Sequence, residues 1–239
     1  MSMIWRRALR AVLPVPIALF FRRQWLARRV ARGKGYHEAD VDRLPGLVKN
    51  TDICWDIGAN SGTYALPLAR LAAKVFAFEP VPHNLDILRL AVRLSGADNI
   101  VIKDIALSDT NGTARMTVPA EGFYGGFYLA QFDDRGTLPV TMATIDSLIE
   151  GGLPAPDFIK CDVEGAEDRV IAGARTLIAE RHPIWLLETF EERILTLMRS
   201  LGYAAHVHLE DGRLVPVAAR TNARNYVFLP AREGGNRGG

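Results

Sequence analysis

The sequence predicts a doubly wound α/β fold, in which helices cover both faces of a mostly parallel sheet of seven strands. Between residues 50 and 190, short apolar runs alternate with stretches of helical periodicity, a pattern typical of such a sheet. The first apolar run opens directly into a glycine-rich turn. Acidic residues follow the ends of successive runs, and the carboxyl ends of parallel strands form the edge where ligands bind. These three observations predict a ligand-binding α/β domain.

The apolar runs give the expected strands, and the segments between them give the helices. Strands are expected at 52–56, 75–79, 100–105, 158–162 and 184–188, with 206–209 and 226–229 as a closing antiparallel pair. Helices are expected at 39–47, 63–73, 82–96, 146–150, 166–180 and 191–201. Pro82 suits a first helical turn, whereas Gly96 and Gly202 suit helix ends.

Residues 113–142 interrupt this alternation and predict a β-hairpin or meander inserted on the crossover. Apolar and polar residues alternate there, and glycines stand at positions 122, 125, 126 and 136. The aromatic rings of segment 122–128 either stack on an acceptor molecule or bury one another between the inserted strands. The sequence leaves both interpretations open.

Length and composition fit one globular domain. The chain has 239 residues, of which 49% are hydrophobic, enough for one sizeable core. We expect a basic helical N-terminal extension at 1–36, the α/β domain at 37–230 and a disordered, glycine-rich tail at 231–239. Cys54 and Cys161 fall inside expected strands, which favours buried thiols in a reducing cytosol over a disulfide.

Charge is unevenly distributed along the chain. The 29 basic and 27 acidic residues leave a net charge of +2, but residues 1–37 hold eight arginines, Lys34 and no acid. The remainder is therefore net acidic, which argues against a nucleic-acid-binding surface on the domain. The apolar stretch 11–21 is shorter than the roughly twenty residues that a bilayer span needs, and no small-residue cleavage site follows it.

Three interpretations of this basic segment remain open. It packs on the domain with its arginines in water, it rests on an anionic membrane surface with Trp5 and Trp25 near the headgroups, or it binds a protein partner. We therefore expect a cytoplasmic protein, with peripheral contact at the inner face of the membrane as a further hypothesis.

The glycine-rich turn after the first expected strand predicts a nucleoside-containing cofactor. Asp56 is followed by Gly58, Asn60 and Gly62, and the second strand ends at Glu79. An acid at that strand end can accept hydrogen bonds from both hydroxyls of a ribose. Dinucleotide-binding turns place a glycine where Asn60 stands, and Asp56 adds negative charge beside the turn. A cationic or zwitterionic ligand such as S-adenosylmethionine suits the site better, with the turn amides facing its methionine portion.

Four segments of the chain resemble the class I S-adenosylmethionine-dependent methyltransferases, and within them the FkbM-type methyltransferases. They are 56–62 (DIGANSG), 78–80 (FEP), 106–109 (ALSD) and 159–167 (IKCDVEGAE). Their order and spacing match the family pattern over roughly residues 35–230. The resemblance implies a Rossmann-like methyltransferase sheet and an enzyme that methylates hydroxyls of sugars, glycolipids or polyketide-like products.

The resemblance and the strand ends together give the expected site. The cofactor-binding residues are expected to be Glu38, Asp56, Gly58, Asn60, Gly62, Glu79, Pro80, Asp104, Ala106 and Asp162. The resemblance implies that the loop of Glu38 contacts the methionine end of the cofactor. Ala106 and Asp104 are expected beside the adenine. The catalytic residues are expected among Asp162, Glu164 and Glu188.

Methyl transfer to oxygen requires the acceptor hydroxyl to lose its proton. Asp162 and Glu188, at the ends of expected neighbouring strands, are plausible oxygen ligands for Mg²⁺, which would lower the pKa of that hydroxyl. This metal site is an analogy with other O-methyltransferases of the fold. The competing mechanism is metal-free, with Glu164 or a histidine as the base.

The sequence thus favours an S-adenosylmethionine-dependent O-methyltransferase that acts on a saccharide, a glycoconjugate or a related natural product. The alternatives are a catalytically silent cofactor-binding or membrane-scaffold protein and, third, a nicotinamide oxidoreductase. The identity of the acceptor, the preference for oxygen over nitrogen and the oligomeric state do not follow from the sequence.

Overall fold

The computed structural model describes residues 15–34, 38–118 and 131–231. Its main sheet has eight strands in the order β11-β10-β12-β9-β8-β1-β2-β3. In chain order they are β1 Ile53–Ile57, β2 Lys74–Phe78, β3 Ile100–Lys103, β8 Phe158–Cys161, β9 Ile184–Glu188, β10 Tyr203–His208, β11 Leu214–Pro216 and β12 Asn225–Pro230. The five strands from β3 to β9 are parallel, and the last three join antiparallel. The predicted mostly parallel sheet is confirmed, and β11 adds an edge strand that the sequence analysis did not include.

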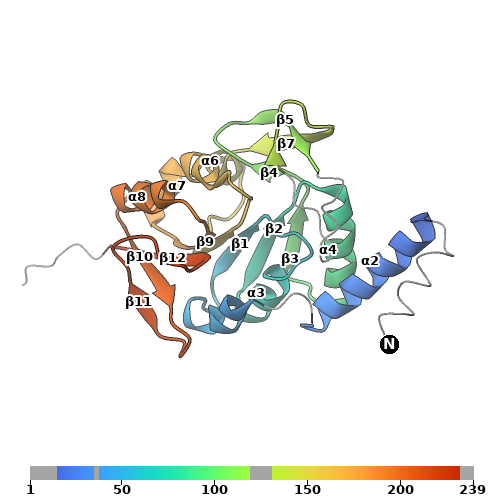
Figure 1. Cartoon of the computed structure of the whole chain (residues 1–239), viewed down its shortest axis with the longest axis horizontal. Coiled ribbons are helices and arrows are strands. Elements are labelled where there is room, and N and C mark those ends of the chain that lie inside the picture. The colour runs from blue at the N-terminus through green and yellow to red at the C-terminus, as the bar shows by residue number, and fades with distance from the viewer. Residues whose placement is uncertain (1–14, 35–37, 119–130, 232–239) are drawn as a thin grey trace, which may run out of the picture.

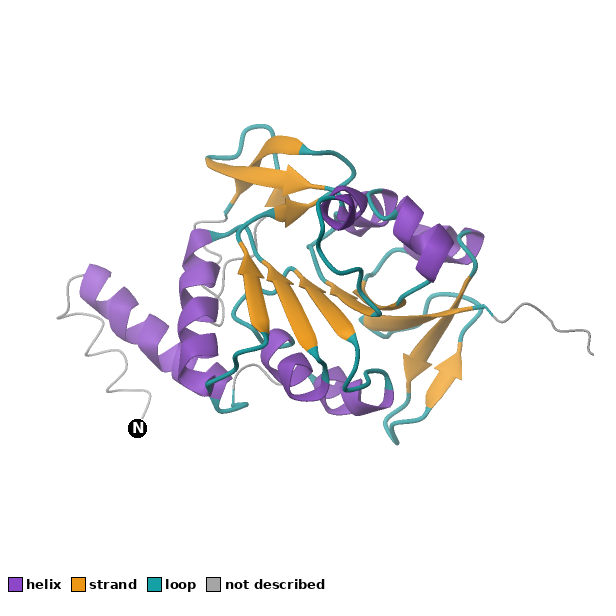
Figure 2. Ribbon diagram, turned by 180° about the vertical axis from the view of Figure 1, so that it is seen from behind, coloured by secondary structure: helices purple, strands orange, loops and turns teal. Residues whose placement is uncertain are grey.

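The predicted insertion forms a second, separate sheet. It contains β4 Ala106–Leu107, β5 Gly112–Thr117, β6 Gln131–Phe132 and β7 Leu138–Ala143, in the order β4-β7-β5-β6. Figures 1 and 2 show this sheet above the central strands of the main sheet. A cluster of Val81, Ala106, Met116 and Val140 packs it against the chain that leaves β2. Segment 122–128, the predicted aromatic platform, lies outside the described residues.

Helices cover both faces of the main sheet, as the alternation of residues along the strands requires. On one face lie η1 Ala39–Gly46, α3 Ala65–Leu71 and α4 Pro82–Ser95, and on the other α5 Ile145–Glu150, α6 Glu167–Ala172, α7 Arg175–Arg181 and α8 Glu192–Ser200. Cys54 of β1 packs on the first layer, whereas Trp55 packs on the second. Cys54 and Cys161 are buried free thiols, as predicted.

The helix predicted at 166–180 is broken into α6 and α7 at Gly173. A Cβ atom at Gly173 would lie 2.1 Å from the backbone oxygen of Ser108, so the two backbones approach more closely than any side chain allows. The break therefore follows from packing against the second sheet, a contact that the local sequence does not reveal. The short helix predicted at 39–47 is present as the 3₁₀ helix η1.

The N-terminal helix α2, Val15–Ala31, lies outside both layers and packs on α4 (Figure 1). Leu26, Ala27 and Val30 are buried against α4, and Arg23 pairs with Asp86 of α4 at 2.6 Å. The part of the predicted extension that the structure describes is thus helical, with one face packed on the domain. Trp5 lies outside the described residues.

Candidate functional site

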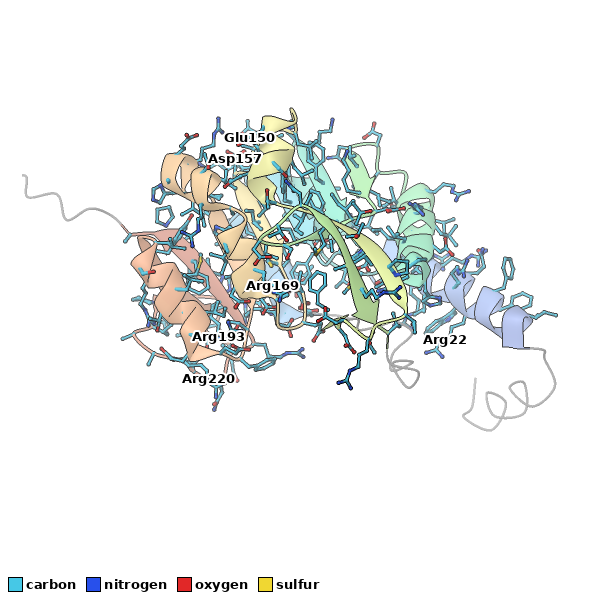
Figure 3. The ribbon with its side chains drawn as sticks, turned by 90° about the horizontal axis from the view of Figure 1, so that it is seen from above. Arg22, Glu150, Asp157, Arg169, Arg193 and Arg220 are labelled. Atoms are coloured by element: carbon cyan, nitrogen blue, oxygen red, sulfur yellow. The ribbon has the colours of Figure 1, made fainter. Side chains whose placement is uncertain are left out.

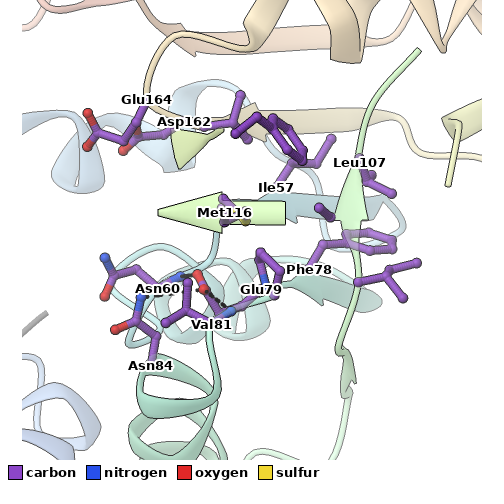
Figure 4. A pocket seen from close by; sticks show the side chains of 16 residues that line it. Ile57, Asn60, Phe78, Glu79, Val81, Asn84, Leu107, Met116, Asp162 and Glu164 are labelled. Carbon is purple, nitrogen blue, oxygen red and sulfur yellow. Dashed lines mark hydrogen bonds between the residues drawn. The ribbon is translucent and has the colours of Figure 1, made fainter. Parts of the chain in front are cut away.

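A pocket lies at the carboxyl ends of β1, β2 and β8, between the main sheet and the second sheet (Figure 4). Its polar lining comes from the turn after β1, the end of β2, the start of α4 and the loop after β8: Asn60, Glu79, Asn84, Asp162 and Glu164. Its apolar lining includes Phe78, Leu107, Met116 and Phe132, of which the last three belong to the second sheet. The pocket therefore joins acids from two strand ends to an apolar wall.

Glu79 is held in place by backbone amides. Its Oε2 accepts a hydrogen bond from the amide of Asn60 at 2.8 Å, and its Oε1 accepts one from the amide of Val81 at 2.8 Å. The side chain is 4% exposed, and burial raises the pKa of Glu79 to about 7 although these hydrogen bonds lower it. Oε1 also accepts a longer hydrogen bond, of 3.4 Å, from Nδ2 of Asn84. With two acceptor sites on each oxygen, Oε2 retains capacity for a further donor, whereas a further donor to Oε1 would replace the long Asn84 bond.

The backbone amides of the turn after β1 have hydrogen-bond partners at the end of β2. The amides of Gly58 and Ala59 donate to the backbone oxygen of Phe78 at 3.0 and 2.9 Å, and the amide of Asn60 donates to Glu79. These three amides thus have partners within the protein, and the expected contact of the turn with the methionine portion of the cofactor stays a prediction. Asn60 has φ of 49°, which asparagine tolerates better than most residues.

Gly62 contacts the helix layer instead of the pocket. A Cβ atom at Gly62 would lie 2.8 Å from Cδ1 of Leu88 on α4. Gly62 has φ of 96°, a backbone conformation that favours glycine. Its place in the motif is thus explained by packing, and its predicted contact with the cofactor stays a prediction.

Asp56 lies below the pocket on β1 and is 2% exposed. Its Oδ2 has no hydrogen-bond partner among the described residues. Burial raises the pKa of Asp56 to about 7, and the charge of Lys160 is the main opposing influence. Lys160 is the register partner of Asp56 on the neighbouring strand β8. A buried oxygen without a partner is uncommon and fits a polar ligand group.

Asp162 and Glu164 lie together at one end of the pocket, in the loop that follows β8 (Figure 4). Glu164 has φ of 54°, and its pKa is raised by burial and then by the charge of Asp162. The loop is fixed by Glu167, whose Oε1 accepts hydrogen bonds from the amides of Val163 and Gly165. Glu167 thus holds the loop at the start of α6, and the two acids before it face the pocket.

Glu188 ends β9 and is paired with an arginine. Its Oε1 accepts a hydrogen bond from Nε of Arg224 at 3.1 Å and another from Nη2. Burial, then the charge of Asp162, raises the pKa of Glu188 to about 7. Asp162 itself lies 3.7 Å from Nζ of Lys160.

These pairings bear on the predicted Mg²⁺ site at Asp162 and Glu188. Both carboxylates face cationic side chains, and the described residues contain no group of three or more His, Cys, Asp or Glu that could hold a metal ion. Mg²⁺ needs several oxygen ligands in an octahedral arrangement. The side chains present therefore do not fit a magnesium site.

Two further residues predicted to bind the cofactor, Asp104 and Glu38, lie outside the pocket lining. Asp104 is exposed just after β3, pairs with Arg89 at 3.2 Å and does not line the pocket, and its expected place beside the adenine stays a prediction. The neighbouring Ala106 does line the pocket, as does Pro80. Glu38 accepts a hydrogen bond from the hydroxyl of Tyr64 at 2.6 Å. No described histidine lines the pocket.

Lys160 is the main residue that the sequence analysis missed. It lies on β8 within an apolar run, is 1% exposed, and its ammonium sits 4.8 Å from the ring centroid of Tyr64. A lysine in the middle of a central strand was itself a signal, because this residue type is almost never fully buried. Met116 and Phe132 could not be assigned, because their contact with the pocket depends on how the second sheet packs.

The fold and the acidic strand ends define a methyltransferase-type α/β domain, and comparison with known proteins identifies the family. The sequence profile described as the Methyltransferase FkbM domain matches residues 56–205, so this chain belongs to the FkbM methyltransferase family. The matched region begins at Asp56 and ends within β10, and it contains all the described residues that line the pocket.

Relatives with assigned functions cover much of the chain. It is 33% identical over 142 residues to the hexuronic acid methyltransferase AglP of Haloferax volcanii, covering 57% of this chain and 56% of AglP. It is 30% identical over 221 residues to the 31-O-demethyl-FK506 methyltransferase FkbM of Streptomyces tacrolimicus, covering 75% of this chain and 81% of that protein. The chain is 28% identical over 160 residues to the 2-O-methyltransferase NoeI of Sinorhizobium fredii, covering 58% of this chain and 64% of NoeI.

A solved structure shows the same fold. The crystal structure of methyltransferase FkbM from Methylobacillus flagellatus KT aligns with a TM-score of 0.54 at 20% identity. The alignment covers 82% of this chain and 47% of that one. The chain thus spans about half the length of that protein and of AglP.

Proposed function

We propose that this chain binds S-adenosylmethionine in the pocket and transfers its methyl group to a hydroxyl of a saccharide, a glycoconjugate or a related natural product. The observation that carries the proposal is the Glu79 carboxylate, fixed at the pocket wall by two amides at 2.8 Å. A carboxylate fixed in this way suits the two hydroxyls of a ribose. When bound, the cofactor supplies a methyl group on a positively charged sulfur.

The remaining lining suits the other parts of the cofactor. Pro80, Ile105 and Ala106 form an apolar wall next to Glu79 that fits an adenine ring. The acids of the loop after β8 supply negative charge where a sulfonium would be stabilised. The unpartnered Oδ2 of Asp56 is a further group that a cationic or zwitterionic ligand would satisfy.

We assign the role of base to Glu164. It lines the pocket, and its raised pKa makes its carboxylate a better proton acceptor than an ordinary glutamate. Glu188 is a weaker candidate because Arg224 holds its Oε1 and because it does not line the pocket. Glu164 would take the hydroxyl proton of the acceptor while Asp162 keeps negative charge beside the reacting groups.

The acceptor class is supported by the relatives. By their names, AglP methylates a hexuronic acid, NoeI is a 2-O-methyltransferase and FkbM acts on a demethylated FK506. All three names fit an oxygen acceptor on a sugar or a polyketide-like product. In this chain, Met116 and Phe132 of the second sheet form the wall that such an acceptor would contact.

Calorimetry with S-adenosylhomocysteine tests the cofactor site. We expect the unmodified chain to bind, and Glu79→Ala to lose about 10- to 100-fold in affinity, because charge-assisted hydrogen bonds to both ribose hydroxyls are removed. Glu150→Ala, an exposed acid at the end of α5, is the control and should bind normally. Undiminished binding by Glu79→Ala would refute the ribose assignment.

Methyl transfer is tested with labelled S-adenosylmethionine and a panel of glycans and macrolide-type alcohols. Transfer to one class identifies the acceptor. Cofactor binding without transfer to any member would favour the catalytically silent alternative. Thermal stabilisation by a nicotinamide cofactor, and not by S-adenosylhomocysteine, would favour the oxidoreductase.

We further propose that α2 rests on an anionic membrane surface. Four large apolar side chains of α2 are exposed: Ile17 43%, Phe20 54%, Phe21 60% and Trp25 48%. Their spacing places them on one face of the helix, and exposed Arg28 and Arg29 continue that face. Figure 3 shows α2, which carries Arg22, at the outer edge of the molecule. Its positive charge complements an anionic bilayer, whereas no described helix is long and apolar enough to cross one.

Sedimentation of the full chain with lipid vesicles tests this surface. We expect binding to vesicles that contain phosphatidylglycerol, weakened by salt, and no binding to phosphatidylcholine alone. Changing Phe20, Phe21 and Trp25 to serine should abolish binding, whereas Leu94→Ser on α4, 46% exposed, should not. Equal binding by the triple variant would overturn the proposal, as would self-association through this face in light scattering. A location at the inner face of the cytoplasmic membrane stays a prediction.

A further inference from the structure

Lys160 is a buried cation with an incomplete set of partners. Its side chain is 1% exposed, and its ammonium has no hydrogen-bond partner among the described residues. The nearest carboxylate atom, Oδ2 of Asp162, is 3.7 Å away, beyond hydrogen-bond distance. The ring of Tyr64 covers the ammonium at 4.8 Å. An ammonium carries three donors, so this group is poised for an acceptor that the protein does not supply.

The surroundings of Lys160 are acidic. Burial lowers the pKa of Lys160, but the charges of Asp162, Glu188, Glu38 and Asp56 outweigh it and raise the pKa overall. The ammonium therefore stays charged while buried. Arg224 is hydrogen-bonded to one of these carboxylates, Glu188, so Lys160 is the cation among these described groups that lacks a hydrogen-bonded acceptor.

Asp56 supplies the complementary feature. Asp56 and Lys160 are register partners on the neighbouring strands β1 and β8. Both side chains are more than nine-tenths buried, and Oδ2 of Asp56 and Nζ of Lys160 each lack a hydrogen-bond partner in the described chain. One unsatisfied anion next to one unsatisfied cation matches the two charges of a free α-amino acid group. Two unrelated buried groups left unsatisfied side by side would be uncommon.

This pair lies under the acidic end of the pocket. Asp162, two residues after Lys160, lines the pocket, and the turn that follows Asp56 forms another part of its lining. Tyr64, which covers the ammonium, is tied to Glu38 by a hydrogen bond of 2.6 Å. The pair is thus bounded by the pocket on one side and by the Tyr64–Glu38 contact on the other.

We propose that Lys160 binds the carboxylate of the cofactor's amino-acid end, with Asp56 facing its α-ammonium. The inference rests on the proposed function, since it assigns the methionine portion of S-adenosylmethionine to a charged pair on β1 and β8. The competing explanation is that Lys160 is only an internal counterion for Asp162. The two explanations differ in how the affinity should change when the carboxylate of the ligand is removed.

The test uses three ligands that share the adenosine and the thioether. S-adenosylhomocysteine has the whole amino acid, decarboxylated S-adenosylhomocysteine lacks only the carboxylate, and 5′-methylthioadenosine lacks the amino acid altogether. With the unmodified chain, calorimetry should show about 10- to 100-fold weaker binding for the decarboxylated ligand. Equal affinity for the first two ligands would overturn the proposal without any variant.

Lys160→Met completes the experiment, because methionine fills a similar volume without charge. We expect Lys160→Met to bind S-adenosylhomocysteine and its decarboxylated form equally, and 5′-methylthioadenosine as the unmodified chain does. A matched control is Lys74→Met, a strand lysine whose ammonium lies 5.6 Å from the Phe76 ring at the other end of β2. It should keep the full preference for the carboxylate.

The outcomes separate the two levels of the proposal. If no adenosine ligand binds the unmodified chain, the proposed function fails. If Lys160→Met lowers the affinity for all three ligands by the same factor relative to the unmodified chain, Lys160 is a structural counterion and this inference fails. If Lys160→Met does not fold, Lys160→Gln replaces it, and the comparison of ligands on the unmodified chain remains decisive.

Discussion

The backbone oxygen of Asp162 lies so close to Gly58 that a Cβ atom added at Gly58 would sit 1.9 Å from it. Gly58 also has φ of 79°, a conformation that side chains disfavour. The turn after β1 and the end of β8 are thus packed backbone against backbone. The two motifs that build the pocket therefore depend on each other, and any side chain at position 58 must push them apart.

We expect Gly58→Ala to lower the free energy of unfolding by about 2–4 kcal/mol, because it combines overpacking with backbone strain. The affinity for S-adenosylhomocysteine should fall with it, since the displaced turn carries the amide that holds Glu79. Chemical denaturation and calorimetry measure the two effects. Gly46→Ala is the control, because no atom lies within 4 Å of its added Cβ. An unchanged Gly58→Ala protein would contradict the close packing.

Cofactor affinity should depend on pH around neutrality. Burial raises the pKa of both Asp56 and Glu79 to about 7, so both acids are mostly ionised at pH 8 and mostly protonated at pH 6. The ionised forms attract a cationic ligand and accept hydrogen bonds from a ribose. We expect S-adenosylmethionine to bind about tenfold or more weakly at pH 6 than at pH 8. Calorimetry at both values measures this, and Glu79→Gln should reduce the pH dependence.

The free energy of unfolding of the ligand-free chain should depend on pH in the opposite direction from cofactor affinity, and be higher at pH 6 than at pH 8. A carboxyl whose folded pKa is raised binds more protons in the folded state than in the unfolded state between its two pKa values. Asp56 and Glu79 therefore each favour the folded state by about 1 kcal/mol more at pH 6 than at pH 8. Denaturant unfolding of Asp56→Asn and Glu79→Gln should show less of this change. A greater loss of stability at pH 6 in the unmodified chain, traced to these two positions, would contradict the raised pKa values.

Methyl transfer should proceed without a divalent metal. Asp162 faces Lys160, and Glu188 is held by Arg224, so neither carboxylate has the set of oxygen neighbours that Mg²⁺ needs. We expect labelled methyl transfer to keep its rate after dialysis against a chelator and to gain nothing from added Mg²⁺. Loss of turnover with the chelator, restored by Mg²⁺, would show that these side chains rearrange around a metal.

The sheet and its acidic strand ends could be predicted because both depend on local patterns. The apolar runs placed β1, β2, β8 and β9 within a residue or two of their observed bounds, and Asp162 and Glu79 follow their strands as expected. The break at Gly173 and the second sheet could not be predicted in the same way. They arise where segments distant in sequence meet, such as Gly173 against Ser108.

The charges inside the site were harder to predict than its positions. The sequence predicts Asp162 and Glu188 as metal ligands, because a sequence does not show which cations face them. Those cations are Lys160, which lies on β8, and Arg224, which directly precedes β12. The pairing of Asp104 with Arg89 could not be predicted for a related reason, since it depends on how α4 packs beside β3.

Glu164→Gln tests the proposed base and separates it from a binding role. Glutamine keeps the size of the side chain but cannot accept the proton of the acceptor hydroxyl, so kcat should fall by about 10²- to 10⁴-fold. Binding of S-adenosylhomocysteine should change little, because Glu164 is not assigned to the ribose or to the amino-acid end.

The pH profile of the rate adds a second measurement. In the unmodified chain kcat should rise with pH through the raised pKa of Glu164, since only the carboxylate can take the proton. In Glu164→Gln that limb should disappear. Glu150→Gln, an exposed acid on α5, is the control for the loss of one negative charge and should keep both rate and profile. If Glu164→Gln retains the rate and the limb, the base must be sought at Asp162, the other acid in the same end of the pocket.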